Sequence, residues 1–76
     1  MAVQIYTTPT CPYCIQVKKY LDEKNISFEN VDVSSDPTKA KEMIEKSGQR
    51  GVPVLDIGGS IVLGFDRQKI NELLNL

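Results

Sequence analysis

The sequence predicts an α/β domain in which three helices flank a mixed four-stranded sheet, in the order β-α-β-α-β-β-α. Runs of β-branched and aromatic residues alternate with segments of helical periodicity along the chain. Two short apolar runs near the C-terminus are separated by only Gly58 and Gly59, which is typical of an antiparallel hairpin. Short right-handed crossovers make the first two strands parallel, so we expect both strand directions in one sheet.

Length and charge limit the classes of function. The chain has 76 residues, of which 25% are charged, and a formal net charge of −1. We therefore expect one domain, residues 1–76, without a nucleic-acid surface. No segment is long and apolar enough to cross a membrane, and the N-terminal residues lack the pattern of a signal peptide. These features predict a cytoplasmic monomer whose partners are small molecules or other proteins.

The first strand and the first helix are predicted from the first third of the chain. Residues 2–7 alternate apolar and more polar side chains and end at the breaker Thr8-Pro9-Thr10, which indicates a strand. A helix over residues 12–24 follows, because apolar residues then recur at spacings of three and four. The apolar positions of this helix are Cys14, Val17 and Leu21.

Residues 27–33 predict a second strand that is rich in β-branched and aromatic side chains. Phe28 is out of step with Val31 and Val33, which suits a strand that is covered on both faces. We therefore expect this strand inside the sheet or near its centre.

The second helix has a start signal and a stop signal. Asp36 is the expected N-cap, Pro37 occupies the first helical position, and Gly48 ends the helix. Its expected buried stripe consists of Ala40, Met43 and Ile44.

The last third of the chain predicts a hairpin and a closing helix. Residues 52–57 and 60–63 are the two hairpin strands. Asp66 is the expected N-cap of the helix, where Phe65 can pack against Ile70 as a hydrophobic staple. The apolar face of this helix consists of Ile70, Leu73 and Leu74.

The segment Cys11-Pro12-Tyr13-Cys14 holds both cysteines and lies where a strand ends and a helix begins. A helix N-terminus stabilises the thiolate of the first cysteine, and only a thiolate attacks disulfides. A permanent disulfide is not expected in a reducing cytosol, and two cysteines without histidine are too few for a closed zinc site. We therefore predict a redox-active pair in which Cys11 is the nucleophile and Cys14 resolves the mixed disulfide.

Three separated motifs resemble the glutaredoxin family of the thioredoxin fold, and the resemblance covers essentially the whole chain. They are Cys11-Pro12-Tyr13-Cys14, Val52-Pro53 and Gly64-Phe65-Asp66. The resemblance implies a thiol-disulfide oxidoreductase that reduces glutathione mixed disulfides and protein disulfides, with glutathione as co-substrate and no bound cofactor or metal. It also implies a cis peptide bond before Pro53, with the backbone of Val52 beside Cys11 as an edge for a bound peptide.

The same resemblance implies a glutathione groove around the cysteines. Tyr13 lines this groove in the family. The backbone of Gly64, Phe65 and Asp66 binds the γ-glutamyl carboxylate, with the acidic side chain near the ligand's ammonium group. Asp66 as a helix cap alone is the simpler alternative, and the two roles are compatible.

Two positions depart from the family pattern. Thr8 and Gly51 stand where many glutaredoxins have lysine and threonine, so the cation for the glycine carboxylate of glutathione is missing from its usual place. Gln49 or Arg50, just ahead of Val52, can reach the same end of the groove.

The short C-terminal part also resembles the glutaredoxin-like redoxins that serve ribonucleotide reductase and are recycled by thioredoxin reductase. Two electron donors therefore stay open at this point, glutathione and thioredoxin reductase. A further alternative is a non-enzymatic module in which the two cysteines bridge an iron–sulfur cluster between two copies of the chain.

Overall fold

The computed structural model describes residues 2–76, so residue 1 of the predicted domain lies outside the described residues. The elements are β1 (Val3–Thr7), α1 (Pro12–Glu23), β2 (Glu29–Asp32), α2 (Pro37–Ser47), β3 (Val54–Ile57), β4 (Ser60–Leu63) and α3 (Arg67–Leu74). The sheet has the strand order β2-β1-β3-β4, in which β1 and β2 are parallel and the other pairs are antiparallel. The predicted fold class is confirmed. No helix within residues 2–76 is both long and apolar enough to span a membrane.

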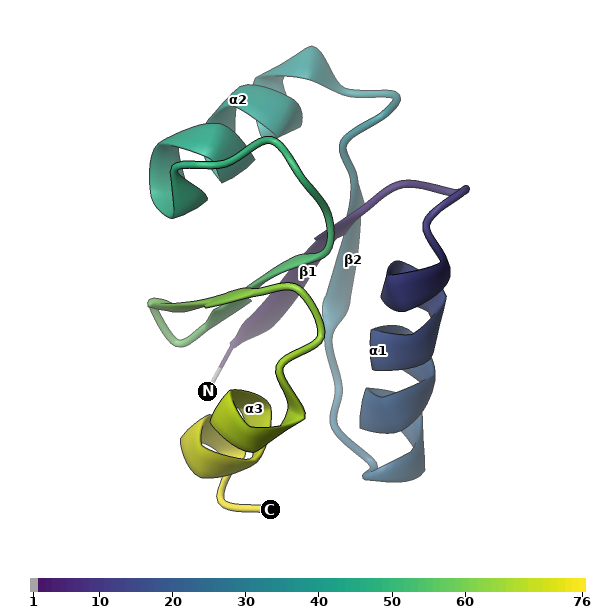
Figure 1. Cartoon of the computed structure of the whole chain (residues 1–76), viewed down its shortest axis with the longest axis vertical. Helices are drawn as coiled ribbons and strands as arrows, with labels where there is room; N and C mark the ends of the chain where they lie inside the picture. The colour runs from purple at the N-terminus through teal and green to yellow at the C-terminus, as the bar shows by residue number, and fades with distance from the viewer. Residues whose placement is uncertain (1) are drawn as a thin grey trace.

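The sheet separates α2 on one face from α1 and α3 on the other (Figure 1). Each face buries its own apolar cluster. The α1/α3 cluster contains Val3, Ile5, Val17, Tyr20, Leu21, Leu55, Ile57, Val62 and Ile70. The α2 cluster contains Tyr6, Val31, Met43 and Val54. The central strand β1 supplies both clusters because successive side chains of a strand point to opposite faces.

The second strand is not central, and this prediction was wrong. β2 pairs with β1 alone and forms one edge of the sheet, with Glu29 and Asn30 exposed, because β3 occupies the other side of β1. Phe28 packs against the α1/α3 cluster, whereas Val31 belongs to the α2 cluster. The mixed apolar pattern therefore reflects one anchor on each face of an edge strand.

The predicted limits of α2 are confirmed, but its buried stripe is narrower than expected. The Asp36 carboxylate accepts the N–H groups of Thr38 and Lys39 at 3.0 and 3.3 Å, and Gly48 ends the helix with a φ of 74°. Of the three expected residues only Met43 is buried, whereas Ala40 is partly exposed and Ile44 is 36% exposed. A single helix packed on a small cluster buries only the side chains that point straight at the sheet.

The connections around β4 also follow the predicted signals. Gly58 and Gly59 have φ values of 58° and 97°, as a primed hairpin turn requires. Asp66 caps α3 by accepting the Lys69 N–H at 3.2 Å. Phe65 packs against the α1/α3 cluster, which includes Ile70, in agreement with the expected staple.

A polar cluster fastens α2 to the sheet beside its apolar contacts. The Lys46 ammonium lies 2.9 Å from the Asp56 carboxylate on β3 and 3.3 Å from that of Glu42. It also donates to the Tyr6 hydroxyl at 2.8 Å, and this hydroxyl donates to Glu42 at 2.9 Å. Burial raises the pKa of Tyr6, so its hydroxyl stays neutral and able to donate.

Candidate redox site

Cys11 is the N-cap of α1 and lies beside the loop that precedes the helix. Its Sγ accepts the backbone N–H of Cys14 at 3.1 Å, and its own N–H donates to the Thr8 carbonyl at 3.4 Å. The first N–H groups of a helix have no intrahelical partner and carry partial positive charge. The Cys11 sulfur therefore lies at the positive end of the α1 dipole.

Cys14 lies behind Cys11 and has a different environment. Both cysteines are free thiols, but Cys11 is 9% exposed, whereas Cys14 is fully buried. Burial, followed by a hydrogen bond with Cys11, raises the pKa of Cys14 to about 11. A backbone hydrogen bond from Thr8 and the charge of Lys18 act in the opposite direction. Cys14 is therefore a protonated thiol at neutral pH, and the accessible sulfur is that of Cys11.

The loop before β3 brings a backbone edge to the thiols. The Val52-Pro53 peptide bond is cis, and the Cys11 Sγ lies 3.8 Å from the Val52 carbonyl oxygen, as the family resemblance implied. The Gly64 N–H donates to the Pro53 carbonyl at 2.9 Å, which joins this loop to the start of α3. Within residues 2–76 the Val52 N–H has no hydrogen-bond partner. An extended chain beside Cys11 can therefore pair with Val52.

Among residues 2–76, none of the other predicted groove residues is hydrogen-bonded to the two thiols. Tyr13 is 62% exposed on the first turn of α1. Phe65 is half-buried, and Asp66 is occupied as the cap of α3. The Gln49 amide donates to the Gly51 carbonyl at 3.5 Å. Arg50 is exposed and forms no ion pair with a residue in the described part of the chain.

Sequence reasoning assigned no role at the thiols to the backbone of Thr8. In the structure the Thr8 carbonyl accepts the Cys11 N–H, and the backbone of Thr8 also acts to lower the pKa of Cys14. The available signal was the strand-breaking segment Thr8-Pro9-Thr10 directly before Cys11. A segment that leaves a strand just before a helix exposes backbone groups to the first helical turn.

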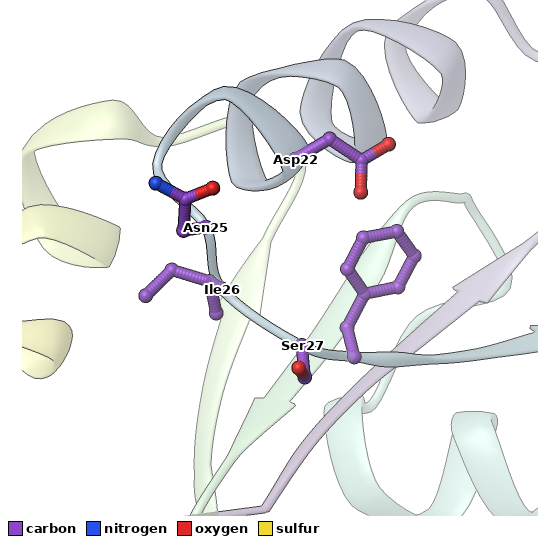
Figure 2. Close-up of a pocket in the computed structure, with 5 residues that line it drawn as sticks. Asp22, Asn25, Ile26 and Ser27 are labelled. Atoms are coloured by element: carbon purple, nitrogen blue, oxygen red, sulfur yellow. The ribbon is translucent and has the colours of Figure 1, made fainter.

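A hollow of about 470 Å³ lies away from the thiols, where α1 turns toward β2. It is lined by Asp22, Asn25, Ile26, Ser27 and Phe28, which Figure 2 shows around the end of the helix. Asp22 follows Cys11 by eleven residues, which is about 16 Å along a helix axis. This hollow is therefore not part of the redox site.

The fold and the site together define a thioredoxin-fold protein with a dithiol at the start of α1. The sequence model of the Glutaredoxin family matches residues 3–62. An uncharacterized glutaredoxin-like 8.6 kDa protein in the rubredoxin operon of Clostridium pasteurianum is 46% identical over 72 residues, covering 95% of this chain and 96% of that protein. Glutaredoxin 3 of Escherichia coli strain K12 is 39% identical over 64 residues, covering 84% and 77% of the two chains. The chain belongs to the glutaredoxin family, whose members are thiol-disulfide oxidoreductases.

A solved structure with similarity to nearly the whole chain is that of the glutaredoxin-like protein NrdH-redoxin from Escherichia coli. The two structures superpose with a TM-score of 0.83 at 32% sequence identity, covering 96% of this chain and 95% of the other. The resemblance to short glutaredoxin-like redoxins is thus supported by structure as well as by sequence.

Proposed function

We propose that this oxidoreductase reduces glutathione mixed disulfides and protein disulfides in the cytoplasm, with glutathione as electron donor. Cys11 is the nucleophile and Cys14 is the resolving thiol. The observation that carries this assignment is the asymmetry of the pair. The Cys11 sulfur caps α1 and accepts the Cys14 N–H at 3.1 Å, while Cys14 is buried behind it with a raised pKa.

The proposed cycle consists of two exchanges. The Cys11 thiolate attacks one sulfur of the substrate disulfide, forms a mixed disulfide with it and releases the other sulfur as a thiolate. The Cys14 sulfur then attacks the Cys11 sulfur and displaces the second thiolate, which takes up the Cys14 proton. The substrate has gained two electrons, and the protein holds a Cys11–Cys14 disulfide. Two molecules of glutathione reduce this disulfide and leave as glutathione disulfide.

The environment of Cys14 explains why Cys14 reacts only after Cys11 has formed the mixed disulfide. Two of the causes that raise its pKa, the hydrogen bond and the negative charge, come from Cys11. Both are lost when Cys11 becomes part of a mixed disulfide. Formation of the mixed disulfide therefore favours ionisation of Cys14 at the stage where a second thiolate is needed.

The free backbone edge positions the substrate in this proposal. Val52 offers an unpaired N–H and a carbonyl beside Cys11. An extended substrate segment therefore pairs with the backbone of Val52 as an added β-strand. For glutathione, the segment that leads into α3, at Gly64, Phe65 and Asp66, receives the γ-glutamyl group. Tyr13 flanks the cysteine of glutathione, and Gln49 or Arg50 faces the glycine carboxylate of glutathione.

A second candidate is a redoxin that thioredoxin reductase recycles and that donates electrons to ribonucleotide reductase or another partner. Thr8 and Gly51 at the altered groove positions favour it. So does the full-length similarity to NrdH-redoxin, a protein described as having a thioredoxin-like activity profile. We rank it second because a missing, partly exposed ion pair weakens glutathione binding by only about 0.2–1 kcal/mol.

A coupled NADPH assay tests the function and the donor together. The protein is supplied either with glutathione and glutathione reductase or with thioredoxin reductase, and it reduces a glutathionylated peptide or a protein disulfide. Cys14→Ser should keep glutathionyl-peptide reduction, because Cys11 alone can take up the glutathionyl group and a second glutathione can remove it. The same variant should lose reduction of the protein disulfide, whereas Cys11→Ser should lose both activities. Turnover with thioredoxin reductase but none with saturating glutathione would establish the second candidate. Equal loss of glutathionyl-peptide reduction in both variants would contradict the assigned roles.

A further inference from the structure

A groove lies between α1 and the start of α3. It is a hollow of about 290 Å³ lined by Gln16, Lys19, Tyr20, Glu23, Phe65 and Arg67. The rings of Tyr20 and Phe65 form its apolar part, with centroids 5.6 Å apart and planes inclined at 56°. The Arg67 guanidinium lies 5.0 Å from the centre of the Tyr20 ring. Aromatic stacking orients such a guanidinium, which is suited to bidentate binding of a carboxylate.

The charges of the groove favour an acidic occupant. Lys19 on α1 and Arg67 on α3 contribute positive charge from the two helices that form it. Neither has a carboxylate within ion-pair distance among residues 2–76. Glu23 also lines the groove, but it follows Lys19 by one helical turn, on the side away from Cys11. On α1, the unpaired cation of Lys19 therefore lies closer to Cys11 than the single carboxylate does.

The groove and the site of disulfide exchange share helix α1 and the segment that precedes α3. Phe65 directly follows Gly64, which is hydrogen-bonded to Pro53 at 2.9 Å, and the adjacent Val52 carbonyl lies 3.8 Å from the Cys11 sulfur. On α1, Tyr13 precedes Gln16 by three residues, so both lie on one helix face. A chain bound at Val52 can thus continue into the groove.

Distance along the helix sets the position of the acidic residue. Lys19 follows Cys11 by eight residues, which is about 12 Å along a helix axis. An extended chain covers about 3.3 Å per residue, so about four residues span this distance. Glutathione has one residue on each side of its cysteine and is too short to do so.

We propose that this groove docks an extended segment of the partner protein that carries a carboxylate about four residues from the cysteine that Cys11 attacks. Lys19 and Arg67 bind the carboxylate, and Tyr20 and Phe65 contact the apolar part of the segment. The inference rests on the proposed function, because it assumes that a protein disulfide is attacked by Cys11. It adds the chemical class of partner, an acidic flanking sequence.

The test uses peptides with one cysteine, activated as a mixed disulfide with thionitrobenzoate. The peptides carry an acidic, a neutral or a basic residue four positions from the cysteine, on either side of it. Release of thionitrobenzoate by the reduced protein reports the rate of attack. We expect the favoured acidic peptide to react about three- to tenfold faster than its neutral counterpart at low salt, and this preference to decline as salt is raised.

The variants Lys19→Gln and Arg67→Gln should each remove most of this preference and leave the rate with glutathionyl-thionitrobenzoate unchanged. Lys41→Gln removes the same charge from an exposed position on α2 and is the matched control. Lys19→Gln is the more informative variant, because it removes a charge without removing a contact with an aromatic ring. Arg67→Gln also removes the stacking of Arg67 on Tyr20. Equal rates for acidic and neutral peptides, or an equal effect of Lys41→Gln, would overturn the docking proposal.

A binding measurement separates docking from chemistry. Cys11→Ser cannot attack, so its amide chemical shifts can be followed by NMR while an acidic peptide without a cysteine is added. Shifts concentrated at Lys19, Phe65 and Arg67 support the groove, and shifts elsewhere or none contradict it. If wild-type protein reduces no peptide while the groove shifts appear, the proposed function fails and the docking surface stands.

Discussion

At the scale of single residues, the position of the helix start makes two chemically identical side chains different. Cys11 caps α1 and keeps 9% of its surface exposed, whereas Cys14 is carried fully into the interior by the first helical turn. Burial raises the pKa of Cys14, and the hydrogen bond with Cys11 adds to this effect. The three-residue spacing lets the two sulfurs react with each other. It also gives them different environments, which suit Cys11 to the first attack and Cys14 to the second.

The coupling between the thiols predicts a measurable shift. In Cys11→Ser the helix keeps an N-cap that accepts hydrogen bonds, but the thiolate charge beside Cys14 is gone. We expect Cys14 to titrate at about pH 11 in the wild type and at a lower pH in Cys11→Ser, because burial then acts without the charge of Cys11. Thiolate ultraviolet absorbance as a function of pH measures both values, and Cys14→Ser identifies the step. An unchanged midpoint would show that Cys11 does not act on Cys14.

At the scale of elements, α2 is attached to the sheet by polar as well as apolar contacts. Met43 is its buried anchor, and Lys46 reaches β3 and β1 through Asp56 and Tyr6. The Tyr6 hydroxyl lies under the helix and needs partners there, since an unsatisfied buried hydroxyl is costly. The cluster therefore fixes the position of α2 in addition to its small apolar contact.

Replacing Lys46 tests this attachment. Lys46→Met should lower the free energy of unfolding by about 1–2 kcal/mol at neutral pH, because Tyr6 and Asp56 lose a partner. The hydrogen bond from Lys46 lowers the pKa of Asp56, so this stabilisation is complete above the unfolded pKa of about 3.9 and is lost as pH falls through the lower folded value.

The measurement is urea unfolding of both proteins at neutral pH and at a pH below the lowered folded pKa of Asp56, where the difference between their stabilities should shrink. Lys39→Met is the matched control, because Lys39 pairs only with Glu42 at the surface of the same helix. Its expected effect at neutral pH is below about 0.5 kcal/mol. A loss in Lys46→Met that is equally large at both pH values would mean that the ion pair is not its source.

At the scale of the whole molecule, two clusters depend on one strand. Ile5 and Tyr6 are adjacent in β1 and both fully buried, one in the α1/α3 cluster and the other in the α2 cluster. A chain of 76 residues has a total stability of about 4–11 kcal/mol. Neither cluster is expected to persist alone, because each takes its central side chain from the same strand.

Substitutions in the two clusters should therefore have the same kind of effect. We expect Leu21→Ala and Met43→Ala each to cost about 2–5 kcal/mol, with a single unfolding transition for both faces of the sheet. Far-ultraviolet circular dichroism and NMR signals from α1 and α2 measure this in urea. If α2 melted before α1 in Met43→Ala, the two faces would be separate cooperative units.

The helix ends, the hairpin turn and the helix start at Cys11 were predicted correctly from local sequence signals. Asp36 and Gly48 mark the two ends of α2, and Gly58 and Gly59 form the hairpin turn. Caps and turns can be predicted because they depend on the conformational preferences of a few adjacent residues. The placement of Cys11 at a helix start followed from the same kind of signal. The cis bond before Pro53 came from the family resemblance, since local preferences favour trans.

Tertiary structure decided everything that depends on which elements become neighbours. β2 is an edge strand because β3 pairs with the other side of β1, and Ile44 is exposed because α2 covers only a small part of the sheet. The meeting of Cys11 with Val52, and of Lys19 with Arg67 in one groove, joins residues about forty or more positions apart. Such contacts leave no periodic or spacing signal in a single sequence, because packing of the whole chain, and not local conformational preference, brings the residues together.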